Sequence, residues 1–385
     1  MHILALLVGA ALAQKPCGPD ESETLPANQG RADAGQATTG EVIADQASAV
    51  QVGEAQPTRS GAAVGTVVKE LSLECWYLFQ AKNGDYWFGS EDRGVFRYDG
   101  TKIVNYSTAD GLSGNNIRGI QGDKHGNVYF TTSGGICKFD GRVFTTLTMV
   151  DPPDRESGGG WRLHPDDLWF AAGKGVGRYD GTTLYDLKLP VSDLEAAFRR
   201  EVPNAPYNPY AIFSIYRDSR GHVWFGTSNF GVCRYDGASF GWLYEDHLVN
   251  APNGGLFGLR SVIEDRDRAY WICNTQFKFR IEPGSKDGKL VYTREPGIDP
   301  KLTGNEVIYF QGAVADAEGT LWLSPYGGGV WTWDGTRATN YPVKDGGAHT
   351  HVFKIFMDNA GVQWLGTPTA GPYKFDGDSF EPFRP

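Results

Sequence analysis

The sequence predicts an all-β protein, a seven-bladed β-propeller with four antiparallel strands per blade. The first observation is a repeat, clearest as GDYWFGSEDRGVFRYDG at 84–100 and GHVWFGTSNFGVCRYDG at 221–237. The second is an aromatic residue that recurs every 40 to 55 residues, at Trp87, Tyr129, Trp169, Trp224, Trp271, Trp322 and Trp364. The third is an Asp-Gly pair near the end of six of these seven copies, replaced in the fifth by Glu-Pro-Gly at 282–284. Repeats of about 40–50 residues with several short strands are typical of propeller blades.

The second copy shows how the residues of one blade predict its strands. Apolar residues over 117–123 predict an inner strand, and a glycine-containing turn leads into a second strand over 128–133. A third strand over 136–140 ends in Asp140-Gly141, which turns the chain into an outer strand over 142–147. Asp-Gly between apolar runs favours a tight hairpin, because glycine accepts a positive φ without strain. We expect the aromatic residue on each second strand, which we call the anchor, to pack between neighbouring blades.

The chain before the repeats predicts export. Residues 1–13 combine an apolar run with the small-residue ending Ala-Leu-Ala, as in a secretory signal peptide. Residues 14–63 contain no Phe, Trp or Tyr and predict a disordered linker, because they cannot bury enough apolar surface to order the chain. The propeller is predicted over 64–385, in the periplasm or secreted. Cys17 raises the alternative of a lipoprotein, although the preceding Gln-Lys-Pro is unlike the small apolar residues expected before a lipidated cysteine.

Composition argues against several classes of function. The net charge is -10 and the pI about 5.2, whereas a protein that binds nucleic acid needs a concentrated Lys and Arg surface. No run of about 18 apolar residues predicts a membrane span. Buried free thiols are expected rather than a disulfide framework or a zinc site, because no Cys-x-x-Cys pair occurs among Cys17, Cys75, Cys137, Cys233 and Cys273. We therefore expect a monomer that carries no cofactor and no metal.

The repeat resembles that of a known family. The residues W-F/L-G-T/S, a short turn and G-V-x-R-Y-D-G, preceded by D-x-x-G-x-x-W as in Asp218 to Trp224, resemble the two-component-regulator propeller repeat. That repeat builds the periplasmic sensor halves of many bacterial hybrid histidine kinases, and such proteins are implicated in detecting carbohydrate fragments. The resemblance implies a recognition role, and it covers about four fifths of the chain. The sequence shows one propeller and neither a kinase nor a helix-turn-helix pattern, so signalling is not carried over.

Long loops between successive blades predict a binding site at the mouth of the central channel. They run over about 107–116, 148–161, 188–210, 244–257, 294–307 and 342–350. Loops of this length are frequently functional. Aligning the inner strands places ten residues at or near the mouth: Trp76, Asn116, Arg118, Trp161, Arg162, Tyr210, Arg260, Tyr309, His349 and His351. Guanidinium groups bind carboxylates and aromatic rings stack on sugars, so we expect a carbohydrate, a small anionic ligand or a protein partner there, bound without catalysis.

Two alternatives stay open. The seven-bladed fold also hosts streptogramin lyase, a metal-dependent enzyme with distantly similar W-F-T/S repeats, which implies a lyase or hydrolase. His349, His351 and Glu306 would then be metal ligand or general base, because His-x-His on a strand directs both rings to one side. The other alternative is a protein-interaction scaffold that uses the rims of the blades. The fold alone does not decide among sensor, enzyme and scaffold.

Overall fold

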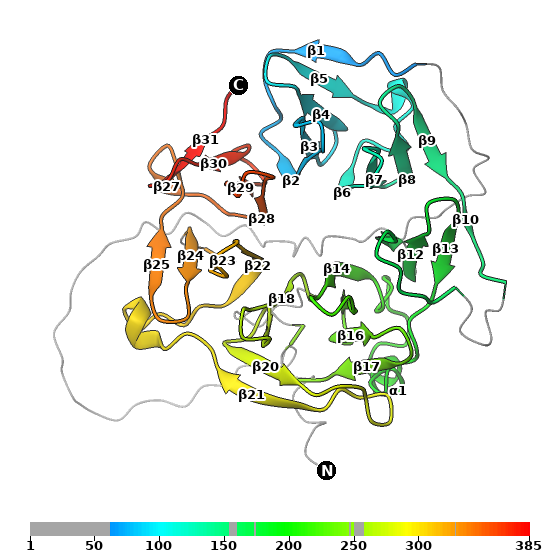
Figure 1. The fold of residues 1–385 in the computed structure, drawn as a ribbon, viewed down its shortest axis with the longest axis vertical. Coiled ribbons are helices and arrows are strands. Elements are labelled where there is room, and N and C mark those ends of the chain that lie inside the picture. Colours follow the sequence, from blue (N-terminus) through cyan, green and yellow to red (C-terminus); the bar gives the residue numbers. More distant parts are fainter. Residues whose placement is uncertain (1–61, 154–159, 173–174, 246–247, 250–257, 328) are drawn as a thin grey trace, which may run out of the picture. The chain divides into compact units, whose positions relative to one another are not determined.

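The computed structural model describes residues 62–153, 160–172, 175–245, 248–249, 258–327 and 329–385. In this part of the chain, seven β-sheets follow one another around a common centre, and each forms one blade of a propeller (Figure 1). The predicted fold class is therefore confirmed. The predicted signal peptide, Cys17 and the predicted linker as far as residue 61 lie outside the described residues.

Blades 1 and 2 show the regular order, in which each strand pairs antiparallel with the next. Blade 1 consists of β2 (Cys75–Gln80), β3 (Tyr86–Ser90), β4 (Val95–Tyr98) and β5 (Ile103–Tyr106), with β1 (Thr66–Val68) as an additional strand outside β5. Blade 2 consists of β6 (Ile117–Gly122), β7 (Val128–Thr132), β8 (Gly135–Phe139) and β9 (Phe144–Leu147). The Asp-Gly turn works as predicted, since the Asp140 carboxylate accepts the Arg142 and Val143 amides and Gly141 has a φ of 94°.

Blades 4 to 7 repeat this order. Blade 4 consists of β14 (Ile212–Arg217), β15 (Val223–Thr227), β16 (Val232–Tyr235) and β17 (Phe240–Leu243). Blade 5 consists of β18 (Val262–Glu264), β19 (Tyr270–Ile272), β20 (Phe277–Ile281) and β21 (Tyr292–Pro296), so the degraded fifth copy still forms a blade. Blade 6 consists of β22 (Phe310–Ala315), β23 (Leu321–Pro325), β24 (Val330–Trp333) and β25 (Ala338–Tyr341). Blade 7 consists of β28 (Lys354–Met357), β29 (Gln363–Gly366), β30 (Tyr373–Phe375) and β31 (Phe380–Pro382).

Blade 3 departs from the predicted pattern. Its strands β11 (Leu168–Ala172), β12 (Gly175–Tyr179) and β13 (Leu184–Leu187) correspond to the second, third and fourth strands of the other blades. The fourth member is β10 (Met149–Val150), which pairs parallel with β13 on the outside. No strand of the described residues pairs with β11 on its inner side. The sequence explains the difference, because three prolines and three glycines over 151–166 replace the apolar run that forms the inner strand elsewhere.

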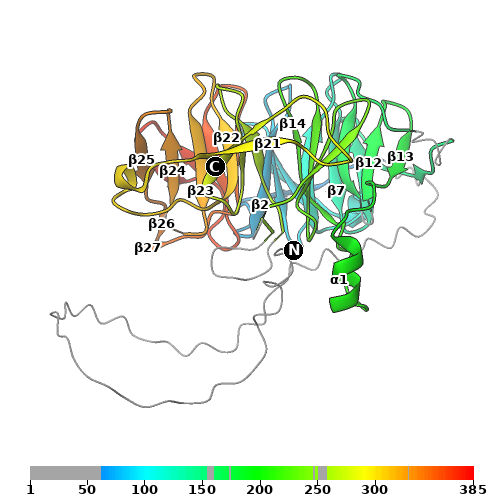
Figure 2. The ribbon, with the colours of Figure 1, turned by 90° about the horizontal axis from the view of Figure 1, so that it is seen from below.

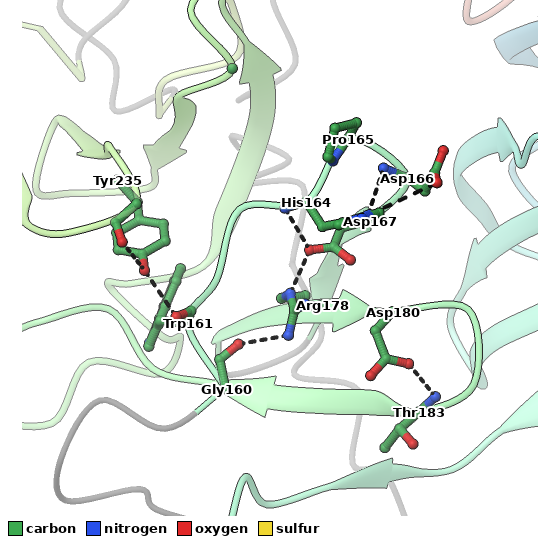
Figure 3. A network of polar contacts seen from close by, with 12 residues as sticks. Gly160, Trp161, His164, Pro165, Asp166, Asp167, Arg178, Asp180, Thr183 and Tyr235 are labelled. Atoms are coloured by element: carbon green, nitrogen blue, oxygen red, sulfur yellow. Dashed lines mark hydrogen bonds and ion pairs between the residues drawn. The ribbon is translucent and has the colours of Figure 1, made fainter.

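The segment that leads into β11 lies between blades 3 and 4 (Figure 3). The Gly160 carbonyl accepts a hydrogen bond from Arg178 on β12, and the Trp161 carbonyl accepts one from the Tyr235 hydroxyl on β16. The Trp161 ring lies 5.8 Å from the Trp169 ring. These contacts fill the space between two blades, and none of the described strands pairs with β11 at the inner position of blade 3.

Five anchors are held by an aspartate six residues earlier in the chain. The carboxylate accepts a hydrogen bond from the anchor side chain in the pairs Asp123–Tyr129 (3.0 Å), Asp218–Trp224 (2.9 Å), Asp265–Trp271 (2.8 Å), Asp316–Trp322 (2.9 Å) and Asp358–Trp364 (2.9 Å). In blades 1 and 3, Ala81 and Leu163 stand at this position, and the Trp87 and Trp169 indole nitrogens have no hydrogen-bond partner among the described residues. The anchor indole therefore depends on an aspartate at the end of the inner strand.

Blades 1 and 3 use a different ion pair in the same turn. An aspartate two residues before the anchor binds an arginine of the third strand, as Asp85 with Arg97 (2.6 Å) and Asp167 with Arg178 (2.7 Å). The Arg178 and Asp167 side chains are 7% and 2% exposed, so this pair is almost fully removed from water. Removing either partner would leave a buried, unpaired charge.

Blade 7 closes the ring against blade 1 by lateral contacts. The Asp358 carboxylate accepts a second hydrogen bond from the Tyr86 hydroxyl of blade 1 (2.8 Å). Cys75 forms an isolated β-bridge with Thr367, and the Gly371 amide donates to the Leu73 carbonyl (2.7 Å). All four strands of blade 7 come from the C-terminal end of the chain, so these two blades are joined without exchanging a strand.

The connections between blades carry the remaining elements. The short helix α1 (Glu195–Glu201) stands off the propeller between β13 and β14, and the hairpin of β26 (Lys344–Asp345) and β27 (Ala348–His349) lies toward the same face (Figure 2). Two 3-10 turns, η1 (Thr108–Asp110) and η3 (Pro300–Thr303), follow β5 and β21. Within the described ranges, no helix is long and apolar enough to span a bilayer. Cys75, Cys137, Cys233 and Cys273 are buried free thiols, as expected.

Candidate functional site

One residue position of the inner strands turns side chains toward the centre of the propeller. The pairing register of four inner strands shifts at Trp76, Arg118, Phe213 and Gln311, each of which is the extra residue of a β-bulge. A bulge leaves the extra residue out of the pairing and redirects its side chain. Arg260 and Phe353 occupy the corresponding position just before β18 and β28. We call these six residues the bulge layer; the equivalent position of blade 3, Gly158, lies outside the described residues.

Contacts within the bulge layer join blades that are far apart in the sequence. The Trp76 and Phe353 rings lie 4.6 Å apart. The Arg260 guanidinium lies 5.5 Å from the Phe353 ring and 4.8 Å from the Phe213 ring. These side chains come from blades 1, 7, 5 and 4, so they converge on the central axis. A guanidinium over an aromatic face gains cation–π attraction.

A cavity of about 530 Å³ lies along the inner strands next to the bulge layer. Its charged lining residues are Arg118, Asp167, Arg217, Arg260 and Lys354. Three residues of β11, Trp169, Phe170 and Ala171, also line it, because no described inner strand covers them in blade 3. The volume falls in the range of small-molecule binding sites, roughly 300–1,000 Å³.

The electrostatic character of the cavity is positive. The one lining carboxylate, Asp167, is already bound to Arg178. Arg217 donates to the carbonyls of His164 (2.7 Å) and Pro165 (2.9 Å), so its charge is not neutralised there. Lys354 has no carboxylate within ion-pair distance among the described residues. Burial and the neighbouring Arg260 guanidinium lower the pKa of Lys354 from 10.5 to about 8.

Several polar atoms at the site are buried without a hydrogen-bond partner among the described residues. They are Trp76 Nε1, Asn116 Oδ1, Trp169 Nε1 and Gln311 Oε1. The other ends of two of these side chains are engaged, since Asn116 Nδ2 donates to Glu91 (2.6 Å) and Gln311 Nε2 to the Val352 carbonyl (2.6 Å). A buried polar group without a partner costs about 1–3 kcal/mol, so a ligand or water that supplied one would be bound favourably.

The ten predicted site residues divide into three groups. Arg118 and Arg260 line the cavity, and Trp76 belongs to the bulge layer. Asn116 and His351 lie beside that layer, where Asn116 shares the Glu91 carboxylate with Arg118 and His351 Nε2 lies 2.8 Å from Gln311 Nε2. Burial of the ring and the nearby Arg260 charge lower the pKa of His351, although the residue as a whole is exposed.

Like Trp76, Asn116 and His351, the remaining five do not line the cavity. Trp161 packs between blades 3 and 4, as described above. The Tyr210 ring lies 4.5 Å from the Phe230 ring, and its hydroxyl donates to Glu195 of α1 (2.7 Å). Tyr309 is half-buried, whereas Arg162 and His349 are exposed, the latter on β27.

The alternative of a metal-dependent enzyme rested on His349, His351 and Glu306. Both histidines and Glu306 are exposed residues, and none of them lines the cavity. In the part of the chain that the structure describes, no three His, Cys, Asp or Glu side chains are placed to hold a metal ion together.

Sequence reasoning missed Lys354 and the open edge of β11. Lys354 follows Phe353 directly, so an apolar strand interrupted by one lysine was the available signal. The proline- and glycine-rich stretch before Trp169 was the signal for the missing inner strand.

Comparison with known proteins supports the fold and the repeat. Residues 206–229, which include β14 and most of β15, match the family described as Two component regulator propeller. This confirms the resemblance found in the sequence. No curated protein matches the chain.

Solved structures share the propeller at low sequence identity. One is the extracellular domain of a B. thetaiotaomicron protein described as a hybrid two component system, with 20% identity, a TM-score of 0.51 and coverage of 82% of this chain. The match covers 39% of that protein's chain, so this chain spans about two fifths of its length. Virginiamycin B lyase from Staphylococcus aureus is 16% identical, with a TM-score of 0.52 and coverage of 83% of this chain and 98% of the lyase. At these identities both neighbours show the fold and nothing of the ligand.

Proposed function

We propose that this chain is an exported, non-catalytic recognition propeller of the sensor type that binds a small anionic ligand, such as an acidic carbohydrate, in its channel cavity. The observation that carries the proposal is the convergence of Arg260 and Lys354, together with Arg118, which also pairs with Glu91 (3.3 Å), on one cavity whose single lining carboxylate is bound to Arg178. The regulator propeller repeat supports a sensor role. The extracellular location of the two-component neighbour and the sequence of residues 1–13 support a periplasmic or secreted location.

The lining favours an anion for a physical reason. Bringing Lys354 and Arg260 together in a partly desolvated cavity costs free energy, which is why the pKa of Lys354 falls. A bound carboxylate or phosphate removes part of this cost and receives charge-assisted hydrogen bonds. Of the aromatic residues in the bulge layer, Phe213 lines the cavity and packs against the Arg260 guanidinium, so it places an apolar group beside the cation.

Calorimetric titration of the full chain with citrate, glucuronate and neutral glucose tests this proposal. We expect the two anions to bind and Arg260→Met to weaken them by about 10- to 100-fold, because a hydrogen bond to a charged group is worth about 1.5–3 kcal/mol. Arg142→Met is the matched control, since Arg142 is an exposed residue on the β8–β9 turn and does not line the cavity. Equal binding of glucose and glucuronate, or an unchanged affinity in Arg260→Met, would contradict the proposal.

The two alternatives gain no comparable observation. The histidine pair and Glu306 lie outside the cavity lining. Large apolar side chains that are exposed, such as Val64, Val191 and Leu302, come from separate parts of the chain and do not single out one rim for a partner.

A further inference from the structure

The inner edge of β11 offers backbone hydrogen-bonding groups to the cavity. In blade 4, the Asp218 amide donates to the His222 carbonyl, so the backbone groups of His222 face the inner strand. The anchor Trp224 lies two residues further on, and its backbone groups face the same way. Trp169 holds the anchor position in blade 3, and its carbonyl accepts a hydrogen bond from the Gln121 side chain of blade 2 (2.9 Å). Because backbone direction alternates along a strand, Ala171 faces the same way as Trp169.

This edge has almost no partners among the described residues. The β11 strand pairs with β12 alone, and the Gln121 side chain occupies one carbonyl. The amides of Trp169 and Ala171 and the carbonyl of Ala171 therefore face the cavity without a described backbone partner. An open strand edge of this kind is a template for a further strand.

The Trp169 indole indicates which chemical group a strand paired with β11 would carry at its end. In blades 4 to 7 the anchor indole donates to an aspartate that follows the inner strand directly or within one residue. Trp169 is 7% exposed, its Nε1 has no partner in the described ranges, and it lines the cavity. A strand that paired with this edge of β11 and was followed by a carboxylate would reproduce the arrangement of blades 4 to 7.

The charge of the cavity favours the same occupant. Arg118, Arg260 and Lys354 line the same cavity as β11; Arg118 also pairs with Glu91 (3.3 Å), and the one lining carboxylate, Asp167, is bound to Arg178. An acidic segment is attracted by these cations, whereas a basic segment would be repelled.

We propose that an extended peptide segment of another protein, ending in an aspartate, adds to β11 as the missing inner strand of blade 3. This inference rests on the anion-binding part of the proposed function, because the peptide carboxylate would bind in the same cavity. The peptide backbone forms hydrogen bonds with Trp169 and Ala171. The peptide carboxylate accepts a hydrogen bond from the Trp169 indole and is attracted by the nearby cations. The mode of recognition is β-strand addition, in which the main chain gives affinity and the side chains give selectivity.

The inner strand of blade 6 provides a suitable probe. Its sequence, Phe-Gln-Gly-Ala-Val-Ala-Asp at 310–316, pairs with an anchor strand in this protein and ends in the aspartate that accepts the Trp322 indole. We expect this peptide, capped at both ends, to bind the full chain with 1:1 stoichiometry in calorimetry. Replacing its aspartate by asparagine, or methylating the backbone nitrogens that face β11, should weaken binding by about tenfold or more.

A substitution in the protein, rather than in the peptide, also tests pairing at this edge of β11. Ala171→Pro removes one edge amide and should weaken the peptide by about tenfold, since proline is tolerated where a strand amide faces away from its neighbour. Ala171→Ser keeps the amide and should bind within about twofold of the wild type. If Ala171→Pro does not fold by circular dichroism, the N-methylated peptide with the wild-type protein decides the matter.

Citrate titration separates this inference from the proposed function. If citrate binds and the peptide does not, or if the N-methylated peptide binds equally well, strand addition is wrong and the site takes free anions or acidic sugars. Strand addition is supported if the peptide binds the wild type but not Ala171→Pro, while the affinity for citrate is the same in both proteins. If neither probe binds, both the inference and the proposed function fail.

Discussion

Replacing Lys354 by methionine should stabilise the propeller at neutral pH. The ammonium lies in the channel cavity beside Arg260, and burial and this neighbour lower its pKa to about 8 from an ordinary value of 10.5. Each pKa unit corresponds to about 1.36 kcal/mol, so the difference amounts to about 3 kcal/mol of unfavourable free energy when the lysine is charged. The residue keeps partial exposure, which screens the charge, and we therefore expect a gain of about 1–3 kcal/mol.

The sign of the pH dependence follows from proton binding. Between pH 8 and 10.5 the unfolded chain holds the Lys354 proton and the folded chain releases it. Stability rises with pH wherever the unfolded state binds more protons. The penalty is thus fully present below pH 8 and disappears as the pH rises toward 10.5. The free energy of unfolding of Lys354→Met should therefore exceed that of the wild type most at pH 7 and least at pH 10.5.

Urea unfolding of wild type and Lys354→Met across pH 6–10.5 measures this difference. Lys102→Met is the control, because Lys102 is exposed in the β4–β5 turn. Subtracting the wild-type curve removes the titration of the thiols and tyrosines, which both proteins share. A variant that is less stable than the wild type at pH 7, or a difference that does not change with pH, would refute the reasoning.

Three further predictions concern the ligand and the blade turns. Citrate affinity should fall as the pH rises through about 8, because Lys354 then loses its charge, and titration calorimetry at pH 7 and 9 checks this. Asp218→Ala should lower the free energy of unfolding by about 2–5 kcal/mol, because a buried indole and a buried phenol lose their acceptor, and urea unfolding measures it. Although burial would raise its pKa, hydrogen bonds and the His222 charge hold the pKa of Asp218 below the ordinary value, so its contribution should be present at neutral pH and lost on acidification. Asp167→Ala should cost about 3–5 kcal/mol by leaving a buried arginine unpaired, and Asp85→Ala should cost less, since its arginine is 29% rather than 7% exposed; equal losses would contradict this.

The fold was predictable because its information is local. Each Asp-Gly turn caps itself with its own carboxylate, as at Asp140, and each second strand carries its own anchor. These devices act within one repeat, so reading seven copies was enough to predict seven blades. The fifth blade was recognisable even though its turn residues had changed.

The candidate site was predictable in part. Counting back a fixed distance from each anchor found Trp76, Arg118 and Arg260, which the bulges and the strand starts direct to the centre. Trp161 and Tyr210 were chosen because their loops are long, yet the structure uses both rings for packing. A loop's length predicts neither the path of its backbone nor the direction of its side chains.

The sequence by itself determined the blades, the anchors and the turns, because each depends on residues within about ten positions of one another. The missing inner strand of blade 3 was visible only as a proline- and glycine-rich stretch. Tertiary structure alone decided that Gly160 and Trp161 lie between blades 3 and 4, that the Gln121 side chain of blade 2 reaches the inner edge of β11, and that Lys354 of blade 7 lines the same cavity. The physical reason is that a cavity is formed by groups distant in the sequence, whose positions depend on how complete blades pack around the centre.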